Sequence, residues 1–364
     1  MESISAPKKP IKPKIPRHMH SFTVDYQEFI VDKRYEFLKL KRLGFYCTIT
    51  ANDTIRNRNV DIEKLCGYEL DKAGLLLVLY KIRLHTFFEH ENILKILDIP
   101  KPIERKDFKD FYIVSQSMET NLARVIASRQ HLSEEHLQYF IFQIVRGLHY
   151  IHSAGISHGN LSPQNISLNR NCDLKISELG HIDLSDLGII STECIPSYWH
   201  NPLEKMLGIK TDSRSKDIWS LGCILGEMVK RSILFDSMDH LDHISLIIKY
   251  LGYPSDDYLS MIENKKTLKY MKKLKKTRKG DFNALVPDAS PSAIDFMLKC
   301  LKITPSERAT TGDLLKHPFL EEFKEEENPE CTDQFPWDWR DFKNMSINRL
   351  KRELYSESLK YHPK

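Results

Sequence analysis

The chain has 364 residues, of which 41% are hydrophobic and 29% charged, the composition of an ordinary globular protein long enough for two lobes or domains. The formal net charge of +4 is too small to argue for a nucleic-acid partner. The longest apolar run, Leu75–Leu79, is too short to span a membrane, and the N-terminus lacks the apolar region of a signal peptide. Seven cysteines at irregular spacing, without a CxxC pair, predict reduced thiols and a cytoplasmic or nuclear location, or both.

Residues 1 to about 20 are rich in Pro and Lys, which favours extended, unpacked backbone, so we expect a disordered basic tail. This tail is either simply solvated, a nuclear-import signal, or a segment that docks on an acidic patch. From residue 21 to 115 the chain reads as short strands around one helix. Val60–Glu63 and Phe111–Val114 have strand patterns, and Gly74–Phe88 has a helical composition.

Residues 116–119 are expected to form a hinge, and the rest of the chain is mainly helical. Ser133 is placed as an N-cap, with Glu134 and Glu135 in the first turn of a helix. Apolar residues follow at helical spacing and form one stripe: Leu137, Phe140, Ile141, Ile144, Leu148 and Ile151. The segment Asp217–Leu225 is apolar nearly all round, which predicts a helix buried inside a lobe.

Two segments carry chemistry: His158–Asn165 reads HGNLSPQN, and Leu174–Gly180 reads LKISELG. They have the shape and separation of a protein-kinase catalytic loop, H-R-D-L-K-P-x-N, and of its metal-binding turn, D-F-G. Further segments follow in the order of the same family: Tyr150–Ala154, Asn169–Ile176, Asp217–Leu225 and His317–Leu320. Over about residues 20 to 360 the chain therefore resembles the mitogen-activated protein (MAP) kinases, most closely the extracellular-signal-regulated branch, with degenerate catalytic motifs.

The resemblance implies an α+β, bilobal protein-kinase fold. Residues 21–115 would form a small β-rich N-lobe with one helix, and residues 116–325 a larger, mainly helical C-lobe. The C-lobe would carry the insert typical of MAP kinases at about residues 253–285. Residues 326–364 would form a C-terminal extension that returns to the N-lobe, and a monomer is expected.

Three positions that perform chemistry in the family are substituted. Asn160 stands where the base Asp belongs, Ser162 where a phosphate-facing Lys belongs, and Glu178 where the Mg²⁺-binding Asp belongs. An amide cannot accept the proton of a substrate hydroxyl as a carboxylate does, and loss of a positioned base costs on the order of 10²–10⁴-fold in rate. Asn165 is retained and could ligate a metal through its amide oxygen, and Glu178 could still reach a metal weakly.

The nucleotide-binding positions are also changed. Kinases close a glycine-rich loop over ATP, but the matching loop here keeps only Gly44, so an ordinary strand turn is expected. The strand lysine that contacts phosphates falls on Glu63 and the helix glutamate on Lys81. We expect this Lys–Glu ion pair to survive with its charges exchanged, which would set a carboxylate against phosphate; a solvated Lys81 is the alternative. Ser115 and Met118 complete the degenerate nucleotide-binding set.

Activation in the family requires phosphorylation at Thr-x-Tyr, and here Thr192 is kept while Cys194 replaces the tyrosine. Gly159 replaces the catalytic-loop Arg that would hold the phosphate. Cys194 is expected to be an inert thiol, with a redox-active thiol as the alternative. The structural positions of the family are retained: His158, Asp217, and the ion pair expected between Glu204 and Arg308.

The docking surfaces of the family are kept. Glu325, Glu326 and Glu327 match the acidic patch that binds basic linear motifs, although a solvated acidic turn is an equal alternative. Tyr270 resembles the aromatic residue that helps to form a second docking pocket. The Lys-rich run around it is expected to be a solvated helix face, with an anionic partner as the alternative.

These features favour a MAP-kinase-like pseudokinase that acts as a docking, scaffolding or competitor protein in a phosphorylation cascade. It would bind MAP-kinase regulators or substrates through their basic docking motifs, without nucleic acid, membrane or a required cofactor. The alternative is a weak or atypical ATP-dependent serine/threonine kinase of the same family. In that enzyme Lys81 would serve the phosphates, and Glu178 with Asn165 would hold Mg²⁺ weakly. A decaying duplicate without a selected role is a third hypothesis.

Overall fold

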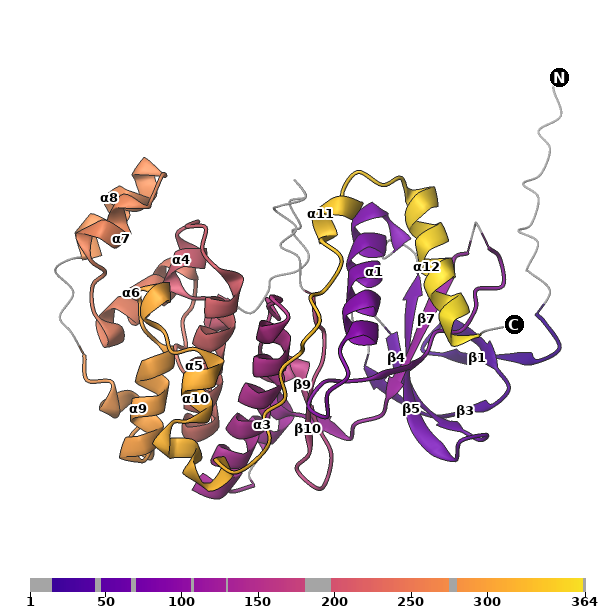
Figure 1. Cartoon of the computed structure of the whole chain (residues 1–364), viewed down its shortest axis with the longest axis horizontal. Coiled ribbons are helices and arrows are strands. Elements are labelled where there is room, and N and C mark those ends of the chain that lie inside the picture. The colour runs from indigo at the N-terminus through magenta and orange to yellow at the C-terminus, as the bar shows by residue number, and fades with distance from the viewer. Residues whose placement is uncertain are drawn as a thin grey trace. The chain divides into compact units, whose positions relative to one another are not determined.

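The computed structural model describes residues 15–42, 47–66, 70–105, 108–128, 130–180, 198–274 and 280–362. The chain divides into two compact units, which are described separately (Figure 1). The sheet unit comprises the residues up to Leu75, Ile96–Ser117 and the residues from Ser346 onward. The helical unit comprises Leu76–Lys95 and Met118–Met345.

The sheet unit begins with an antiparallel hairpin of β1 (Met19–Val24) and β2 (Gln27–Asp32). Its two turn residues, Asp25 and Tyr26, have positive φ angles of 45° and 63°, the geometry that matches a two-residue turn to the twist of the strands. A five-stranded antiparallel sheet follows, in the order β3-β4-β5-β7-β6. Its strands are β3 (Tyr35–Arg42), β4 (Cys47–Asp53), β5 (Arg58–Cys66), β6 (Ile96–Asp98) and β7 (Asp110–Gln116).

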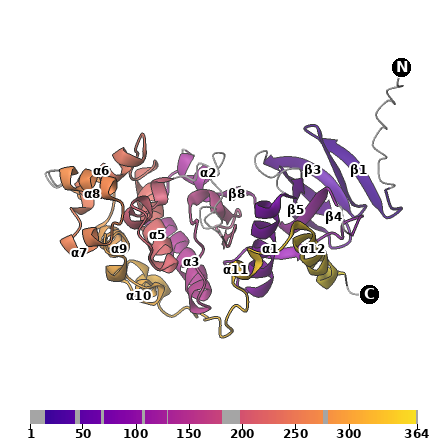
Figure 2. The same cartoon turned by 90° about the horizontal axis from the view of Figure 1, so that it is seen from above.

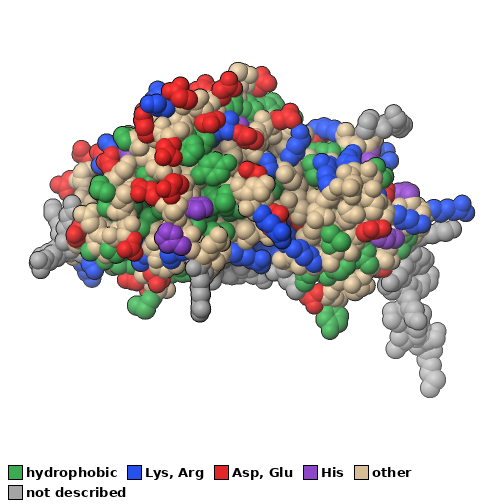
Figure 3. Space-filling view, turned by 90° about the horizontal axis from the view of Figure 1, so that it is seen from below, with side chains coloured by type: hydrophobic (Ala, Val, Ile, Leu, Met, Phe, Trp, Pro, Cys, Tyr) green, Lys and Arg blue, Asp and Glu red, His purple; other side chains and the backbone are tan. Residues whose placement is uncertain are grey.

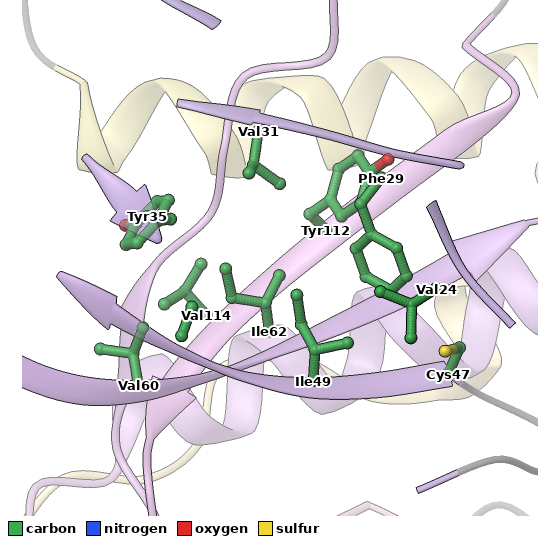
Figure 4. Close-up of a cluster of buried hydrophobic side chains, with 11 residues drawn as sticks. Val24, Phe29, Val31, Tyr35, Cys47, Ile49, Val60, Ile62, Tyr112 and Val114 are labelled. Carbon is green, nitrogen blue, oxygen red and sulfur yellow. The ribbon is translucent and has the colours of Figure 1, made fainter. Parts of the chain in front are cut away.

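The core of the sheet unit lies between this sheet and the hairpin. In Figure 4, Val60 and Ile62 of β5 point toward Phe29 and Val31 of the hairpin, and all four side chains are fully buried. Because side chains alternate along a strand, the residues between and beyond them, Asp61 and Glu63, lie on the opposite face of the sheet.

The last helix, α12 (Ile347–Tyr361), also belongs to the sheet unit. The ammonium of Lys351 donates to the carbonyl of Phe108 at 3.0 Å and lies 4.9 Å from the centre of the Phe108 ring. Just after the helix, the Nε2 atom of His362 lies 3.0 Å from a carboxylate oxygen of Asp98. The C-terminal residues expected to return to the N-lobe therefore contact the sheet unit.

The helical unit contains most of α1 (Lys72–Phe87) and a small antiparallel sheet in the order β10-β9-β8 (Figures 1 and 2). The strands of that sheet are β8 (Thr120–Asn121), β9 (Ile166–Leu168) and β10 (Leu174–Ile176). Its further helices are α2 (Leu122–Ala127), α3 (Glu134–Ser153), α4 (Leu203–Met206), α5 (Ser213–Lys230), α6 (His240–Leu251), α7 (Asp256–Ser260), α8 (Lys265–Leu274), α9 (Pro291–Cys300), α10 (Thr311–Leu315) and α11 (Trp339–Phe342).

Local sequence explains the two central helices, α3 and α5. The Ser133 hydroxyl accepts the backbone N–H of His136, as an N-cap does, and the predicted apolar stripe of α3 is buried. Helix α5 is buried from Asp217 to Met228, a stretch that includes the predicted buried segment Asp217–Leu225. Gly222 allows α5 to pack closely on α9, because a Cβ atom there would lie 2.8 Å from the Cβ atom of Cys300.

The unit boundaries differ slightly from the expected domain limits. Strand β1 already begins at Met19, inside the expected tail, while residues 1–14 lie outside the described residues. The division between the units falls between Ser117 and Met118, within the expected hinge. Helix α1 was expected in the N-lobe, yet from Leu76 onward it belongs to the helical unit, where Lys81 contacts Glu178 and His85 contacts Leu179.

One face of the molecule carries side chains of both charges with hydrophobic side chains among them (Figure 3). On the face shown in Figure 3, acidic side chains (red) and basic side chains (blue) both occur, in keeping with the small net charge of +4. Among the described residues, no helix is both long and apolar enough to cross a membrane.

Candidate functional site

The loop of residues 158–165 is fastened to α5 by Asp217, whose side chain is buried. The two carboxylate oxygens of Asp217 accept the backbone N–H groups of His158 at 2.8 Å and Gly159 at 2.9 Å. The ring of His152 lies at 2.8 Å from the same carboxylate. Gly159 has a φ angle of 82°, a left-handed conformation that glycine adopts without steric cost. The loop therefore has a fixed backbone anchored in the centre of the helical unit.

His158 joins this loop to the segment that follows β10. It is fully buried, its Nε2 atom donates to the carbonyl of Ser177 at 2.9 Å, and its Nδ1 atom accepts the N–H of Asn160 at 3.2 Å. Burial lowers the pKa of His158. A neutral ring with one donor and one acceptor satisfies both contacts, so His158 serves as a structural link.

The substituted loop positions are held by backbone contacts. The Asn165 amide Nδ2 donates to the carbonyl of Asn160 at 2.9 Å, and the Asn165 backbone N–H donates to the carbonyl of the buried Ser162 at 3.0 Å. The carbonyl of Asn165 in turn accepts both the N–H and the hydroxyl of Ser177, each at 2.9 Å. The predicted loop residues Asn160, Ser162 and Asn165 are thus brought together, with an amide where a base would act.

The turn Ser177–Gly180 lies next to α1. The ammonium of Lys81, on α1, lies 3.1 and 3.0 Å from the two carboxylate oxygens of Glu178. Glu178 has a φ angle of 58°, which is uncommon for a residue other than glycine. The structure therefore brings together Lys81 and Glu178, two residues that the sequence singled out for different roles.

His85, one helical turn after Lys81, holds the same turn. Its Nδ1 atom donates to the carbonyl of Leu94 at 2.8 Å, and its Nε2 atom accepts the N–H of Leu179 at 3.3 Å. Burial, with a smaller contribution from the charge of Lys81, lowers the pKa of His85 to about 4. Sequence reasoning missed this residue, although its i+4 spacing from Lys81 on a helix was a usable signal.

A second acidic position lies on the sheet unit. Asp61 shares a face of β5 with Glu63, is buried, and accepts hydrogen bonds from the hydroxyls of Thr50 and Ser117, each at 2.9 Å. The ammonium of Lys41 forms an ion pair with the same carboxylate. The face that would meet phosphates in the family thus carries two carboxylates, and alternation from Glu63 could have revealed Asp61.

The structure describes some of the other predicted nucleotide-binding positions and leaves one of them out. Ser115 is half-buried on β7, where it pairs with Asp61 of β5, and Met118 is buried. Gly44 lies outside the described residues, as do Thr192 and Cys194. Glu63 and Lys81 belong to different units, so their exchanged-charge pair stays a prediction.

The expected docking residues are accessible. Glu325, Glu326 and Glu327 are exposed just after a short 3-10 helix, η7 (Pro318–Phe323). On α8, the hydroxyl of the half-buried Tyr270 donates to the carbonyl of Leu241 at 3.0 Å. The lysines of the Lys-rich run that lie on α8 are exposed: Lys265, Lys266, Lys269, Lys272 and Lys273.

Comparisons with known proteins identify the family. A model of the protein kinase domain matches residues 71–320. The chain is 36% identical over 321 residues to the mitogen-activated protein kinase homolog NTF6 of Nicotiana tabacum, covering 88% of this chain and 86% of that protein. It is 35% identical over 350 residues to extracellular signal-regulated kinase 1 of Dictyostelium discoideum, covering 94% of this chain and 65% of that protein. Mitogen-activated protein kinase 13 of Arabidopsis thaliana is 36% identical over 319 residues, with 87% of each chain covered.

The chain therefore belongs to the protein kinases. Within them, it is a member of the mitogen-activated protein kinase family. The predicted α+β kinase fold is confirmed by the domain match and by the separate sheet and helical units.

Protein kinases hold ATP with Mg²⁺, using the metal-turn Asp and the catalytic-loop Asn as ligands. The metal-turn position here does not fit a divalent metal, because both carboxylate oxygens of Glu178 contact the ammonium of Lys81. The amide nitrogen of Asn165 donates to the carbonyl of Asn160, which leaves the Oδ1 atom of Asn165 as the atom that would ligate a metal. Across the described residues, no group of three or more His, Cys, Asp and Glu side chains could hold a metal ion.

Proposed function

We propose that this chain is a MAP-kinase-like pseudokinase that serves as a docking, scaffolding or competitor protein in a phosphorylation cascade. The observation that carries the proposal is Asn160. The loop around it keeps its anchors, His158 and Asp217, while the residue at the base position is an amide. An amide cannot take up the proton of an attacking hydroxyl, and this step typically contributes 10²–10⁴-fold in rate. The retained anchors, together with the amide at the base position, support a scaffold role for this loop.

The changes on both units reinforce the same conclusion. Glu63 places a carboxylate on the strand face where the family presents a lysine to phosphate, and like charges at close range repel. The neighbouring carboxylate of Asp61 is paired with Lys41, and Lys81 neutralises Glu178, the one carboxylate at the metal position. A nucleotide–metal complex would therefore meet a carboxylate instead of a lysine on the sheet unit and an already neutralised ligand on the helical unit.

The binding surface proposed for this role is the acidic turn Glu325–Glu327. All three side chains are exposed, and none forms an ion pair with another residue that the structure describes. Unneutralised carboxylates attract basic segments and steer their association, an effect that salt screens. The partners proposed are regulators or substrates of MAP kinases that carry basic linear motifs.

A phosphotransfer assay tests the absence of catalysis. The purified full chain, MgATP and a standard MAP-kinase substrate are expected to give no turnover above that of an Asn165→Ala variant. Robust phosphorylation of the substrate that Asn165→Ala abolishes would overturn the proposal and favour the alternative, a weak serine/threonine kinase. In that enzyme Lys81→Ala would also abolish nucleotide binding.

A peptide-binding assay tests the docking role. A fluorescent basic docking peptide is expected to bind the full chain, to bind a Glu325→Gln/Glu326→Gln/Glu327→Gln variant at least about tenfold more weakly, and to bind less well at high salt. The matched control is Glu321→Gln/Glu322→Gln, which removes two exposed carboxylates from η7. Equal loss in both variants, or no binding by the wild type, would argue against this surface.

A further inference from the structure

We propose that the ammonium of Lys81 occupies the position on Glu178 that a divalent metal would take. This ion pair fastens α1 to the Ser177–Gly180 turn without metal or nucleotide. The inference deepens the proposed function and rests on it, since it describes how the same site is held when it performs no chemistry. It departs from the pattern of the family, in which the metal turn carries a metal ligand.

The geometry of the ion pair is the first argument. One ammonium contacts both oxygens of one carboxylate, at 3.1 and 3.0 Å, so each contact is a charge-assisted hydrogen bond. The side chains are 14% and 32% exposed, which shields the pair from water and strengthens it relative to a surface pair. A metal ion that bound Glu178 would compete with this ammonium for the same two oxygens.

The backbone on either side of Glu178 is the second argument. The carbonyl of Ser177 accepts from His158, and the N–H of Leu179 donates to His85, so buried side chains hold the residues before and after Glu178. Glu178 itself adopts a left-handed conformation, with a φ angle of 58°. Such a conformation persists in a non-glycine residue where the surroundings over-determine it. The turn therefore holds the backbone of Glu178 in one conformation, from which its carboxylate reaches the ammonium of Lys81.

The charge state of the site is the third argument. Four titratable groups face one another here: Lys81, Glu178, His85 and His158. Burial keeps both histidines neutral near pH 7, since it lowers the pKa of each. The ammonium of Lys81 and the carboxylate of Glu178 then offset each other at this contact. A divalent cation would add two positive charges beside an ammonium, and like charges at close range repel.

The opposite side of α1 is the fourth argument. The guanidinium of Arg83 lies 5.0 Å from the ring centre of Trp337 and 4.9 Å from that of Phe342. Phe335 makes edge contacts with Tyr80 and Phe87. Aromatic residues that precede α12 thus hold one side of α1, while Lys81 and His85 hold the turn on another side. The Lys81–Glu178 pair completes a fixed placement of α1 within the helical unit.

A double-mutant cycle tests the inference. Urea unfolding is measured in EDTA for the wild type, Lys81→Met, Glu178→Gln and the double variant. We expect each single variant to lower the midpoint and the double variant to be no less stable than either, because the second substitution removes a charge that the first left without this contact. The matched control is the Lys95–Glu89 pair, whose side chains are 59% and 82% exposed and whose coupling should be close to zero. Additive losses at Lys81 and Glu178 would overturn the inference.

Hydrogen exchange adds a readout that general destabilisation would not reproduce. Without nucleotide or metal, amides of α1 should be protected in the wild type and should exchange at least about tenfold faster in Glu178→Gln, while those of α5 change little. Equal acceleration in α1 and α5 would contradict a local fastening.

A metal titration tests the inference on the wild type itself. The wild type should melt at the same temperature in EDTA and in millimolar Mn²⁺. A higher melting temperature in Mn²⁺ that is absent in Glu178→Gln would show that metal, not Lys81, holds Glu178. The failures of the two proposals can be told apart. Phosphotransfer together with intact coupling would overturn the proposed function alone, while an inactive protein without coupling would overturn this inference alone.

Discussion

Arg308 donates to both carboxylate oxygens of Glu204, at 2.7 and 2.9 Å, and the two side chains are 1% and 0% exposed. The guanidinium also donates to the carbonyls of Lys302 at 2.8 Å and Ser215 at 3.0 Å. The pair thereby links α4 to the start of α5 and to the segment after α9. Two buried charges satisfied in this way are costly to separate, because either one alone would remain in a medium of low dielectric.

Arg308→Met is accordingly expected to lower the free energy of unfolding by about 3–5 kcal/mol, the usual cost of removing one partner from a buried pair. Urea unfolding of the variant measures the loss. The double variant Arg308→Met/Glu204→Leu should regain part of it, since no buried charge is left without its partner. Lys324→Met, which breaks an exposed pair with Glu321, serves as the control and should change stability by less than about 0.5 kcal/mol. A similar loss in both single variants would refute the argument.

Gly180→Ala should destabilise the protein by at least about 2 kcal/mol, from backbone strain together with overpacking. Gly180 has a φ angle of 80°, and a Cβ atom there would lie 2.3 Å from Leu84 and 2.8 Å from Tyr80, both on α1. Gly208→Ala is a matched control, because Gly208 has a φ angle of 73° but no atom within 4 Å of its Cβ position. Thermal unfolding of the two variants should therefore differ by the packing contribution. Equal losses of stability in the two variants would mean that the side chains of α1 do not pack closely against Gly180.

The sequence predicted correctly the elements that depend on residues close together in the chain. The cap at Ser133, the buried stripe of α3 and the buried stretch of α5 depend on residues within a few turns of one another. The family motifs also located the loop around Asn160, because their spacing is preserved over a continuous stretch of sequence. Such features need no knowledge of how distant segments pack.

The contacts that define the site were harder to predict from the sequence. Lys81 and Glu178 are 97 positions apart, and the sequence assigned Lys81 to a pair with Glu63 because family spacing offered that partner. Asp61 gains its hydrogen bond from Ser117 across 56 positions. Alternation and helical spacing can say which face a residue occupies, but only the packed structure determines which distant charge that face meets.

The free energy of unfolding should fall as the pH drops through the range between the folded and unfolded pKa values of His85. Burial, and then the charge of Lys81, lower its pKa to about 4, whereas unfolded His titrates near about 6.5. Between these values the unfolded chain binds more protons, so stability is complete above about pH 6.5 and is lost as the pH falls toward 4. At about 1.4 kcal/mol per pH unit, His85 alone contributes a loss of up to about 3 kcal/mol.

Urea unfolding at pH 7 and pH 5 measures this dependence. His85→Leu should be less stable at pH 7, because the carbonyl of Leu94 and the N–H of Leu179 lose their partner, but its stability should fall less steeply between the two values. His90 and His243, whose pKa values burial also lowers to about 4, should leave a residual slope. An unchanged slope in His85→Leu would show that His85 titrates normally in the folded protein.

Asn160→Asp should not convert the chain into an efficient kinase. The substitution restores a carboxylate at the base position, and a positioned base contributes on the order of 10²–10⁴-fold. The phosphates would still meet Glu63, and Glu178 would still be neutralised by Lys81, so a turnover near the 1–100 s⁻¹ typical of kinases is out of reach. Phosphotransfer measured beside an Asn160→Ala control, with both variants melting near the wild-type temperature, should stay far below that range for both variants. Vigorous activity of Asn160→Asp alone would mean that a single residue separates this chain from its catalytic relatives, and that the charges at Glu63 and Lys81 do not prevent MgATP from binding.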